Sequence, residues 1–346
     1  MAVRETEYNE MLPEFIDTGG RAPERSDRPA KEAVAARFPR QLAADLALLL
    51  VTMIWGGTFV MVKDAVAAYP VFTFLAVRFA FAAVALLPLA LWRRRRAAGP
   101  PRRDVPRRRT PLATAAPLVG IALFAGYGFQ TLGLHLTTPA KAGFITGLGV
   151  VVVPVVAAVF LRQRPGVLAW LGVAMATAGL AFLSWQPGAG INPGDALVFC
   201  CALSFAAHIL LTGRFASRVD PLLLTLGQIV TVVVLSGVAS LAFENPPPLT
   251  SGVIFAAAFT GLLATSAAFG VQTLAQRFTT TTHTALIFAA EPVFAALFSF
   301  LLIGEALGPR QFAGCGLILA GMLAAELKLK PGKTDKPVQF GNNVIE

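Results

Sequence analysis

The sequence predicts an all-α membrane protein with ten transmembrane helices, arranged as an inverted repeat of five plus five with both termini cytoplasmic. Three observations carry this prediction: an apolar composition, a long internal repeat, and basic residues gathered on alternate connections. Of the 346 residues, 55% are hydrophobic and 14% are charged, and the mean hydropathy is +0.67. Soluble domains carry about 25% charged residues, so this chain is too apolar to fold in water.

The repeat appears when the sequence is shifted by 142 positions. Gln130-Thr131-Leu132 then falls on Gln272-Thr273-Leu274, and no gap is needed over some fifty residues. Gly172 falls on Gly314, and Gly179 falls on Gly321. A period this long, filled with apolar residues, indicates one half of a duplicated membrane bundle and not a soluble solenoid unit.

Ten apolar spans of about twenty residues follow Gln41, each long enough for a helix to cross the hydrocarbon core. The predicted limits are 42–62, 70–92, 112–134, 138–161, 167–184, 194–213, 221–243, 251–275, 281–303 and 309–327. Short segments rich in Pro, Gly and Asn separate them.

These spans divide the chain into four parts. Residues 1–40 mix acids and bases without periodicity and are expected to be a disordered cytoplasmic tail. Residues 41–187 and 188–328 form the two five-helix repeats, and residues 329–346 form a basic cytoplasmic tail.

The orientation follows from the positive-inside rule. With a cytoplasmic N-terminus, the inner connections hold most of the Lys and Arg residues, nine of them between Arg93 and Arg109. The outer ones hold only Lys63, Lys141 and Arg310. Because each half has an odd number of spans, the second half enters the membrane from the opposite side. The expected product is a pseudo-two-fold axis in the membrane plane, with a substrate site between the halves.

Glu291 lies eleven residues into its span, near the bilayer centre, where ionisable residues are costly and mark function. Pro292 follows it and removes one backbone hydrogen bond. Glu291 is either a proton, cation or substrate-amine site, or a structural carboxylate paired with a neighbouring helix. Arg78 either binds a substrate carboxylate or, the favoured interpretation, has a structural role such as counter-ion of Glu291.

Other polar residues in the spans have two interpretations each. Lys141 and its repeat mate His283 form a matched pair at the two mouths, as gates or, for Lys141, as a snorkelling side chain. His208, deep in the sixth span, is either a proton carrier or, more often for such a residue, a satisfied core residue. Gln130 and Gln272 either line a path or join helices.

Trp55-Gly56-Gly57-Thr58 interrupts the first span, either for close helix packing or as a cavity wall for an amphipathic substrate. Thr58 falls opposite His208 when the two halves are aligned on Trp55 and Phe205. Tyr127 adds a further aromatic contact. Gly143 and Gly147 form a small-residue motif that predicts close helix packing.

Enzyme chemistry finds no support in the sequence. The motifs of metalloproteases, serine hydrolases and nucleotide-binding proteins are missing, and no His/Cys cluster has metal-ligand spacing. Cys200, Cys201 and Cys315 lie inside apolar spans and are interpreted as core residues. We therefore expect no catalytic residues, no metal and no cofactor. The basic loop at 93–109 is explained by anionic lipid without nucleic acid.

The ordered set of motifs resembles the EamA branch of the drug/metabolite transporter superfamily. The resemblance covers about 42–328 and rests on Trp55-Gly56-Gly57, on Arg78, on the run Thr138–Leu148 that contains Lys141 and Phe144, and on Glu291-Pro292 with Gly304-Glu305. It implies a multi-pass bacterial inner-membrane carrier, usually an exporter of amino acids or related metabolites, with a cavity lined by helices 1, 3, 4, 6, 8 and 9. Gln163 departs from it, because an acidic residue often ends the fourth helix there.

The sequence thus predicts a secondary transporter of small metabolites that works by alternating access, as a monomer or homodimer among membrane lipids. A passive facilitator or channel is the first alternative, and a membrane-embedded enzyme or scaffold is the second. The expected substrate pathway combines residues from both halves: Trp55, Thr58, Arg78, Tyr127, Gln130, Lys141, Phe144, His208, Gln272, His283 and Glu291.

Overall fold

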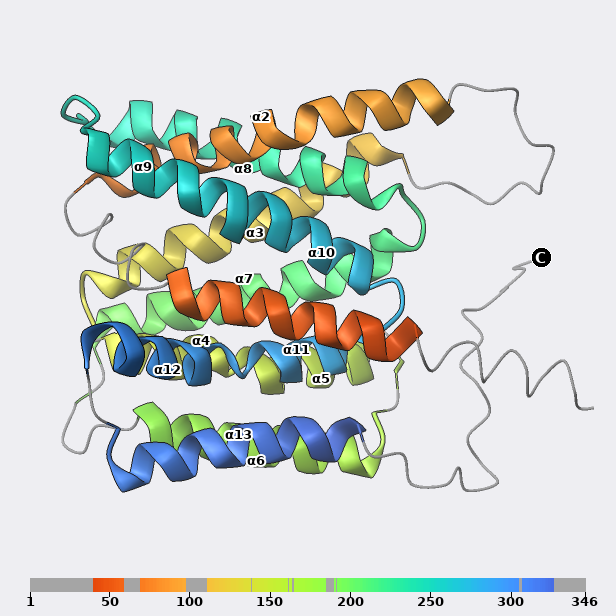
Figure 1. The fold of residues 1–346 in the computed structure, drawn as a ribbon, viewed down its shortest axis with the longest axis vertical. Coiled ribbons are helices and arrows are strands. Elements are labelled where there is room, and N and C mark those ends of the chain that lie inside the picture. Colours follow the sequence, from red (N-terminus) through yellow and green to blue (C-terminus); the bar gives the residue numbers. More distant parts are fainter. Residues whose placement is uncertain are drawn as a thin grey trace, which may run out of the picture. The chain divides into compact units, whose positions relative to one another are not determined.

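The computed structural model describes most of the chain from Arg40 onward as helices (Figure 1). The described residues are 40–58, 69–97, 111–137, 139–160, 162–163, 165–184, 190, 192–304 and 307–326. Within these ranges there is no strand. The tails predicted at 1–40 and 329–346 lie outside the described residues, apart from Arg40 itself.

The helices follow the predicted spans closely. After the helix Arg40–Thr58 come α2 (Val71–Ala97), α3 (Leu112–Leu134), α4 (Pro139–Gly147), α5 (Gly149–Phe160), α6 (Val167–Ser184), α7 (Pro193–Ala216), α8 (Pro221–Phe243), α9 (Ser251–Thr260), the π-helix η1 (Gly261–Ala267), α10 (Ala268–Ala275), α11 (Thr281–Phe288), α12 (Glu291–Ile303) and α13 (Pro309–Glu326). The limits predicted for 112–134, 167–184 and 221–243 are confirmed by α3, α6 and α8.

Eight helical stretches in the described part are long and apolar enough to cross a membrane. They are Arg40–Thr58, Val71–Arg93, Leu112–Gly133, Ala142–Phe160, Pro193–Ala216, Pro221–Phe243, Ser251–Ala275 and Thr281–Leu301. The fifth and tenth predicted spans are the shorter helices α6 and α13, of 18 residues each. α2 continues five residues beyond its predicted limit, through Arg93–Arg96 to Ala97, because arginine is a good helix former and cations favour a helix C-terminus.

The fourth and ninth spans, predicted as single helices, are interrupted. α4 gives way to α5 at Leu148, and α11 gives way to α12 at Ala289-Ala290. The chain tightens at both places: Ala290 N donates to Ile287 O (3.0 Å), and Leu148 N is shared between Ile145 O (3.1 Å) and Phe144 O (3.2 Å). Each span nevertheless remains one helical stretch, Ala142–Phe160 and Thr281–Leu301. Leu148 and Ala290 are equivalent under the 142-residue shift, so the two halves are interrupted at the same place.

The eighth span is also irregular, because its middle residues 261–267 form a π-helix between α9 and α10. The hydropathy of the sequence does not predict this π-helix. Both α- and π-helices satisfy their backbone hydrogen bonds internally, so an apolar span can contain either. π-Helical turns inside α-helices occur often at functional sites.

The helices α6 and α13 pack through two reciprocal glycine pairs. A Cβ atom placed on Gly172 would lie 2.5 Å from Gly321 O, and one placed on Gly179 would lie 2.6 Å from Gly314 O. Gly172 and Gly314 are repeat equivalents, as are Gly179 and Gly321. Exchanging the two halves of the chain therefore converts one contact into the other. Such self-complementary contacts are typical of a two-fold axis, and their order along the chain makes the two helices antiparallel.

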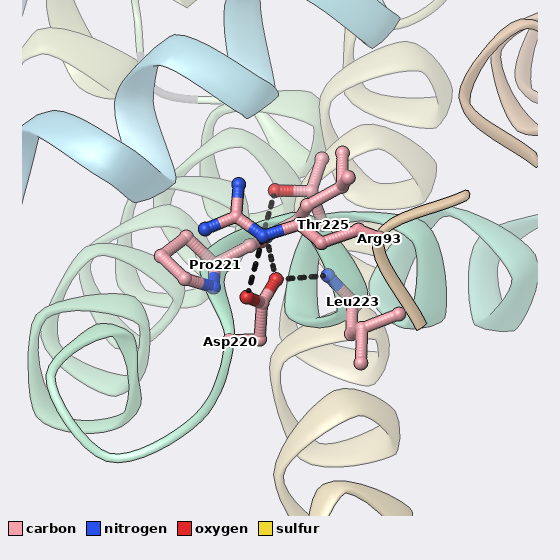
Figure 2. Close-up of polar contacts among 6 residues, drawn as sticks. Arg93, Asp220, Pro221, Leu223 and Thr225 are labelled. Atoms are coloured by element: carbon pink, nitrogen blue, oxygen red, sulfur yellow. Dashed lines mark hydrogen bonds and ion pairs between the residues drawn. The ribbon is translucent and has the colours of Figure 1, made fainter. Parts of the chain in front are cut away.

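The helices α2 and α8 pack antiparallel as well and are joined at both ends. At the start of α2, the Glu244 carboxylate accepts hydrogen bonds from Phe72 N and Thr73 N, both 2.8 Å. At the other end, Arg93 Nε lies 3.0 Å from Asp220 Oδ2, while Asp220 Oδ1 caps α8 by accepting from Leu222 N and Leu223 N (Figure 2).

Apolar residues fill the space between these pairs. One buried cluster joins α2, α3, α8 and α10, with Phe79, Leu123, Ile229 and Phe269 among its members. A second joins α5, α6, α11 and α13, with Leu180, Leu286 and Ile318 fully or almost fully buried. The second core includes parts of both interrupted spans, Val150 of α5 and Leu286 of α11.

Candidate functional site

Glu291 is the first residue of α12, directly after the interruption of the ninth span. Its side chain is half-buried. The N-terminus of a helix carries partial positive charge, which stabilises a carboxylate placed in the first turn. Glu291 stands where α11 ends and α12 begins.

Two glycines bring the helix Arg40–Thr58 against the start of α12. A Cβ atom on Gly56 would lie 2.7 Å from Phe294 Cβ and 2.9 Å from Glu291 O, and one on Gly57 would lie 3.0 Å from the Phe298 ring. A side chain larger than hydrogen at position 56 would have to displace backbone. The geometry at Gly56 and Gly57 is thus that of close helix packing, and it fixes the position of Glu291.

Trp55 and Thr58 lie on the same helix and make different contacts. Trp55 Nε1 donates a 2.8 Å hydrogen bond to Ala264 O, inside the π-helix η1. Its ring packs against Phe269 and Phe288, with centroids 5.5 Å and 5.0 Å away. The buried Thr58 hydroxyl donates to Ile54 O of its own helix, at 2.9 Å.

Arg78 is buried, with 3% of its surface exposed. Its Nε donates a 2.9 Å hydrogen bond to Thr265 Oγ1, also in η1. The guanidinium carbon lies 5.8 Å from the centre of the Phe79 ring and 5.4 Å from that of Tyr127, which are cation–π distances. The π-helix therefore holds two of the predicted site residues, Trp55 and Arg78.

Tyr127 joins Arg78 to the aromatic residues of the site. Its ring meets Phe79 and Phe205 edge to face, with centroids 5.5 Å and 5.4 Å apart. The structure thus brings together Trp55, Arg78, Tyr127 and Glu291 from four helices.

Arg78 and Glu291 do not form an ion pair, although the structure describes both residues; the ion pair found in the described part of the chain joins Arg93 and Asp220. The counter-ion role favoured for Arg78 from the sequence is therefore not fulfilled. The separation of two residues along the sequence does not determine whether their side chains point toward each other when they belong to different helices.

His208 is a buried member of a hydrogen-bonded chain. Its Nε2 lies 2.7 Å from Gln228 Oε1, and because an amide oxygen only accepts, Nε2 carries the proton. Gln228 Nε2 donates to Thr273 Oγ1 (3.3 Å), which donates to Phe269 O (2.7 Å). The chain joins α7, α8 and α10 and satisfies one ring nitrogen of His208, which fits the core interpretation.

The remaining predicted residues lie away from this group. Gln272 is fully buried and donates to Gln276 Oε1 at 3.4 Å, while Gln276 donates to Ile209 O, so these amides join α10 to α7. Gln130 is half-buried in α3. Phe144 packs on the cluster of α5, α6, α11 and α13.

The expected gate pair is only partly described. His283 is half-buried in α11, with Nδ1 3.4 Å from Gln41 Nε2. Lys141 belongs to α4, but its side chain lies outside the described residues. In the small-residue motif, Gly147 packs closely, since its Cβ would lie 2.7 Å from the Leu180 side chain. A Cβ on Gly143 would have no atom of another described segment within 4 Å.

Sequence reasoning missed Thr265 and Gln228, the partners of Arg78 and His208. Both are polar residues inside apolar spans, and that is the signal by which they could have been found. In the described part of the chain no group of three His, Cys, Asp or Glu side chains is placed to hold a metal ion.

Comparison with known proteins finds a family and several relatives. The EamA-like transporter family matches the chain twice, at residues 42–185 and 192–325. An uncharacterized transporter of Archaeoglobus fulgidus is 33% identical over 299 residues, which cover 86% of this chain and 91% of the relative. The uncharacterized inner membrane transporter YedA of Escherichia coli K12 is 27% identical over 84% of this chain and 93% of its own length.

A solved crystal structure has the same fold. It superposes with a TM-score of 0.70 at 22% identity and covers 82% of this chain and 98% of the other.

Proposed function

We propose that this chain, which belongs to the EamA-like transporter family, is a secondary transporter that exports small metabolites such as amino acids or related amphipathic compounds by alternating access. Its relatives are named as transporters, one of them of the inner membrane. Eight membrane-capable helices fit a multi-pass protein of that membrane.

The observation that carries this proposal is the paired interruption of the fourth and ninth spans. Interrupted helices at corresponding positions of two halves are the pattern by which transporters form a binding site near the bilayer midplane. Here the interruptions lie at Leu148 and at Ala289-Ala290, and Glu291 follows the second. The first half has Gly149 at the equivalent position, so the carboxylate belongs to one half alone.

In this proposal the substrate binds beside the start of α12, where Glu291 provides a negative charge for an amine or other cationic group. Trp55 and Tyr127 provide aromatic surface for the apolar part of an amphipathic molecule. Binding energy from both parts favours compounds that combine a charged group with an apolar body.

Alternating access is supported by the reciprocal packing of α6 and α13. A bundle whose halves are related by a two-fold axis in the membrane plane has two mirror conformations of similar energy, one open to each side. The contacts of the glycine pairs 172–321 and 179–314 are exchanged by such an axis, which supports this arrangement.

The test is the concentration dependence of uptake into proteoliposomes that contain the purified full-length protein. We expect uptake of at least one member of a panel of radiolabelled amino acids and metabolites to saturate. Uptake that stays linear with concentration would favour a passive facilitator. An absence of flux for every compound would reject transport.

A further inference from the structure

We propose that Arg78 is a preformed binding group for a carboxylate of the substrate, and that Thr265 on the π-helix η1 is its positioning residue. This deepens the proposed function, on which it rests, by giving the substrate an anionic group at a defined place. It assigns to η1 the task of orienting the guanidinium.

The first support is the surroundings of the guanidinium. Only 3% of Arg78 is exposed, and the Phe79 and Tyr127 rings lie 5.8 Å and 5.4 Å from its central carbon. Such a buried arginine retains its charge, because guanidinium does not lose its proton in proteins. Burying that charge is costly unless a partner compensates it.

The second support is that, among the described residues, no carboxylate forms an ion pair with Arg78. The hydrogen-bond acceptor of Nε is the neutral hydroxyl of Thr265, and the ion pair found among the described residues is the distant Arg93–Asp220 pair. Guanidinium presents five N–H groups in a planar fork that matches a carboxylate. A carboxylate ligand would therefore supply the missing negative charge, with Glu291 left for a cationic group.

The third support is that η1 orients the Nε donor of Arg78. The Thr265 hydroxyl donates its own proton to Thr260 O (3.1 Å), five residues back, so its lone pairs remain for Arg78 Nε. The backbones are also close, since a Cβ on Gly261 would lie 2.5 Å from Arg78 O. Side chain and backbone of Arg78 are thus both held by one π-helical segment.

The experiment compares two probes that differ only in their charge, N-acetyl-leucine and its neutral amide, N-acetyl-leucinamide. Each is added to the purified full-length protein in detergent, and its dissociation constant is obtained from the ligand-dependent rise in melting temperature. The variants are Thr265→Val and Thr265→Ala, which lack the hydroxyl, and Thr265→Ser, which restores it. Thr177→Val is the matched control, because its hydroxyl donates to Val173 O in the distant helix α6.

We expect the wild type to bind the acid at least about tenfold more tightly than the amide. The Val and Ala variants should bind the acid about tenfold more weakly with the amide unchanged, as expected for losing a hydrogen bond to a charged group. The Ser and Thr177 variants should match the wild type.

Equal binding of acid and amide, or no binding of either, would overturn the carboxylate assignment. Unaltered acid binding in both hydroxyl-free variants, or an equal loss for both probes, would overturn the positioning role. Because binding is measured without flux, these outcomes are distinct from a failure of transport, which the uptake experiment would show.

Discussion

At the scale of single residues, the main feature is a basic and an acidic residue inside the helical bundle that do not form an ion pair with each other. Arg78 is held by a hydroxyl and two aromatic rings, and Glu291 begins α12 beside the close contact of Gly56. Charges retained inside a membrane without a mutual ion pair are expected to serve a ligand. A molecule with both an anionic and a cationic group would meet the needs of both.

We predict that Glu291→Gln reduces saturable uptake at least tenfold, because the amide keeps the shape of the side chain but not its charge. Glu291→Asp, which retains the charge at a shorter reach, should keep measurable uptake. The comparison is made in proteoliposomes at matched protein content. Full transport by Glu291→Gln at every pH would sink both a proton-coupling role and a role in binding an amine.

The candidate site could be predicted from the sequence only in part. Polarity inside apolar spans identified Arg78, His208 and Glu291, because hydrocarbon makes such residues conspicuous. Their partners Thr265 and Gln228 lie in other helices, and no spacing along the chain tells which helices pack together. The structure describes no ion pair between Arg78 and Glu291, and the structural role favoured for Arg78 stays a prediction.

At the scale of helices, length and hydropathy determine where a span lies but not how regular it is. The limits of α3, α6 and α8 were predicted to the residue, because each ends at turn or charged residues. The interruptions at Leu148 and Ala289-Ala290 and the π-helix at 261–267 were not predicted. Leu148 and Ala289-Ala290 are apolar, and residues 261–267 are mostly apolar apart from Thr265 and Ser266, so hydropathy does not mark any of the three irregular segments.

The two ends of the α2–α8 pair should differ in their contribution to stability. We predict that Glu244→Ala lowers the stability by about 1–2 kcal/mol, because its carboxylate caps α2 with two backbone hydrogen bonds. Arg93→Ala should lower the stability by about 0–1 kcal/mol, because the side chains of its ion pair, Arg93 and Asp220, are 54% and 30% exposed. Melting temperatures in detergent test this, and a larger loss for Arg93→Ala would contradict it.

At the scale of the whole molecule, the contacts between α6 and α13 connect the sequence repeat with the symmetry of the fold. The sequence repeat aligns Gly172 with Gly314 and Gly179 with Gly321. In the structure Gly172 contacts Gly321, and Gly179 contacts Gly314. The duplication was visible in the sequence, whereas the helix pair on the axis was not.

We predict that Gly172→Ala and Gly314→Ala lower the melting temperature by similar amounts. Their Cβ atoms would lie 2.5 Å from Gly321 O and 2.7 Å from Gly179 O, an overpacking that costs about 1–3 kcal/mol. Gly316→Ala is the matched control in α13, because nothing lies within 4 Å of its Cβ. If one of the pair proved as harmless as the control, the two contacts would not be equivalent.

The predicted orientation can be tested at the ends of α8. In a variant without native cysteines, we expect Pro246→Cys to react with a membrane-impermeant maleimide on intact cells. Arg218→Cys, in an exposed connection on the basic side, should react only after the membrane is permeabilised. The reverse pattern would contradict a cytoplasmic N-terminus.

The central claim, alternating access between the two halves, is tested most directly by counterflow. Proteoliposomes are loaded with unlabelled substrate, diluted into a trace of the radiolabelled compound, and compared with empty ones. For a carrier we expect faster uptake in loaded vesicles, with a transient accumulation of label. The reason is that the binding site returns to the outer side with unlabelled substrate bound and then takes up labelled substrate. Uptake that is unaffected by the internal substrate would contradict the account and indicate a passive pathway.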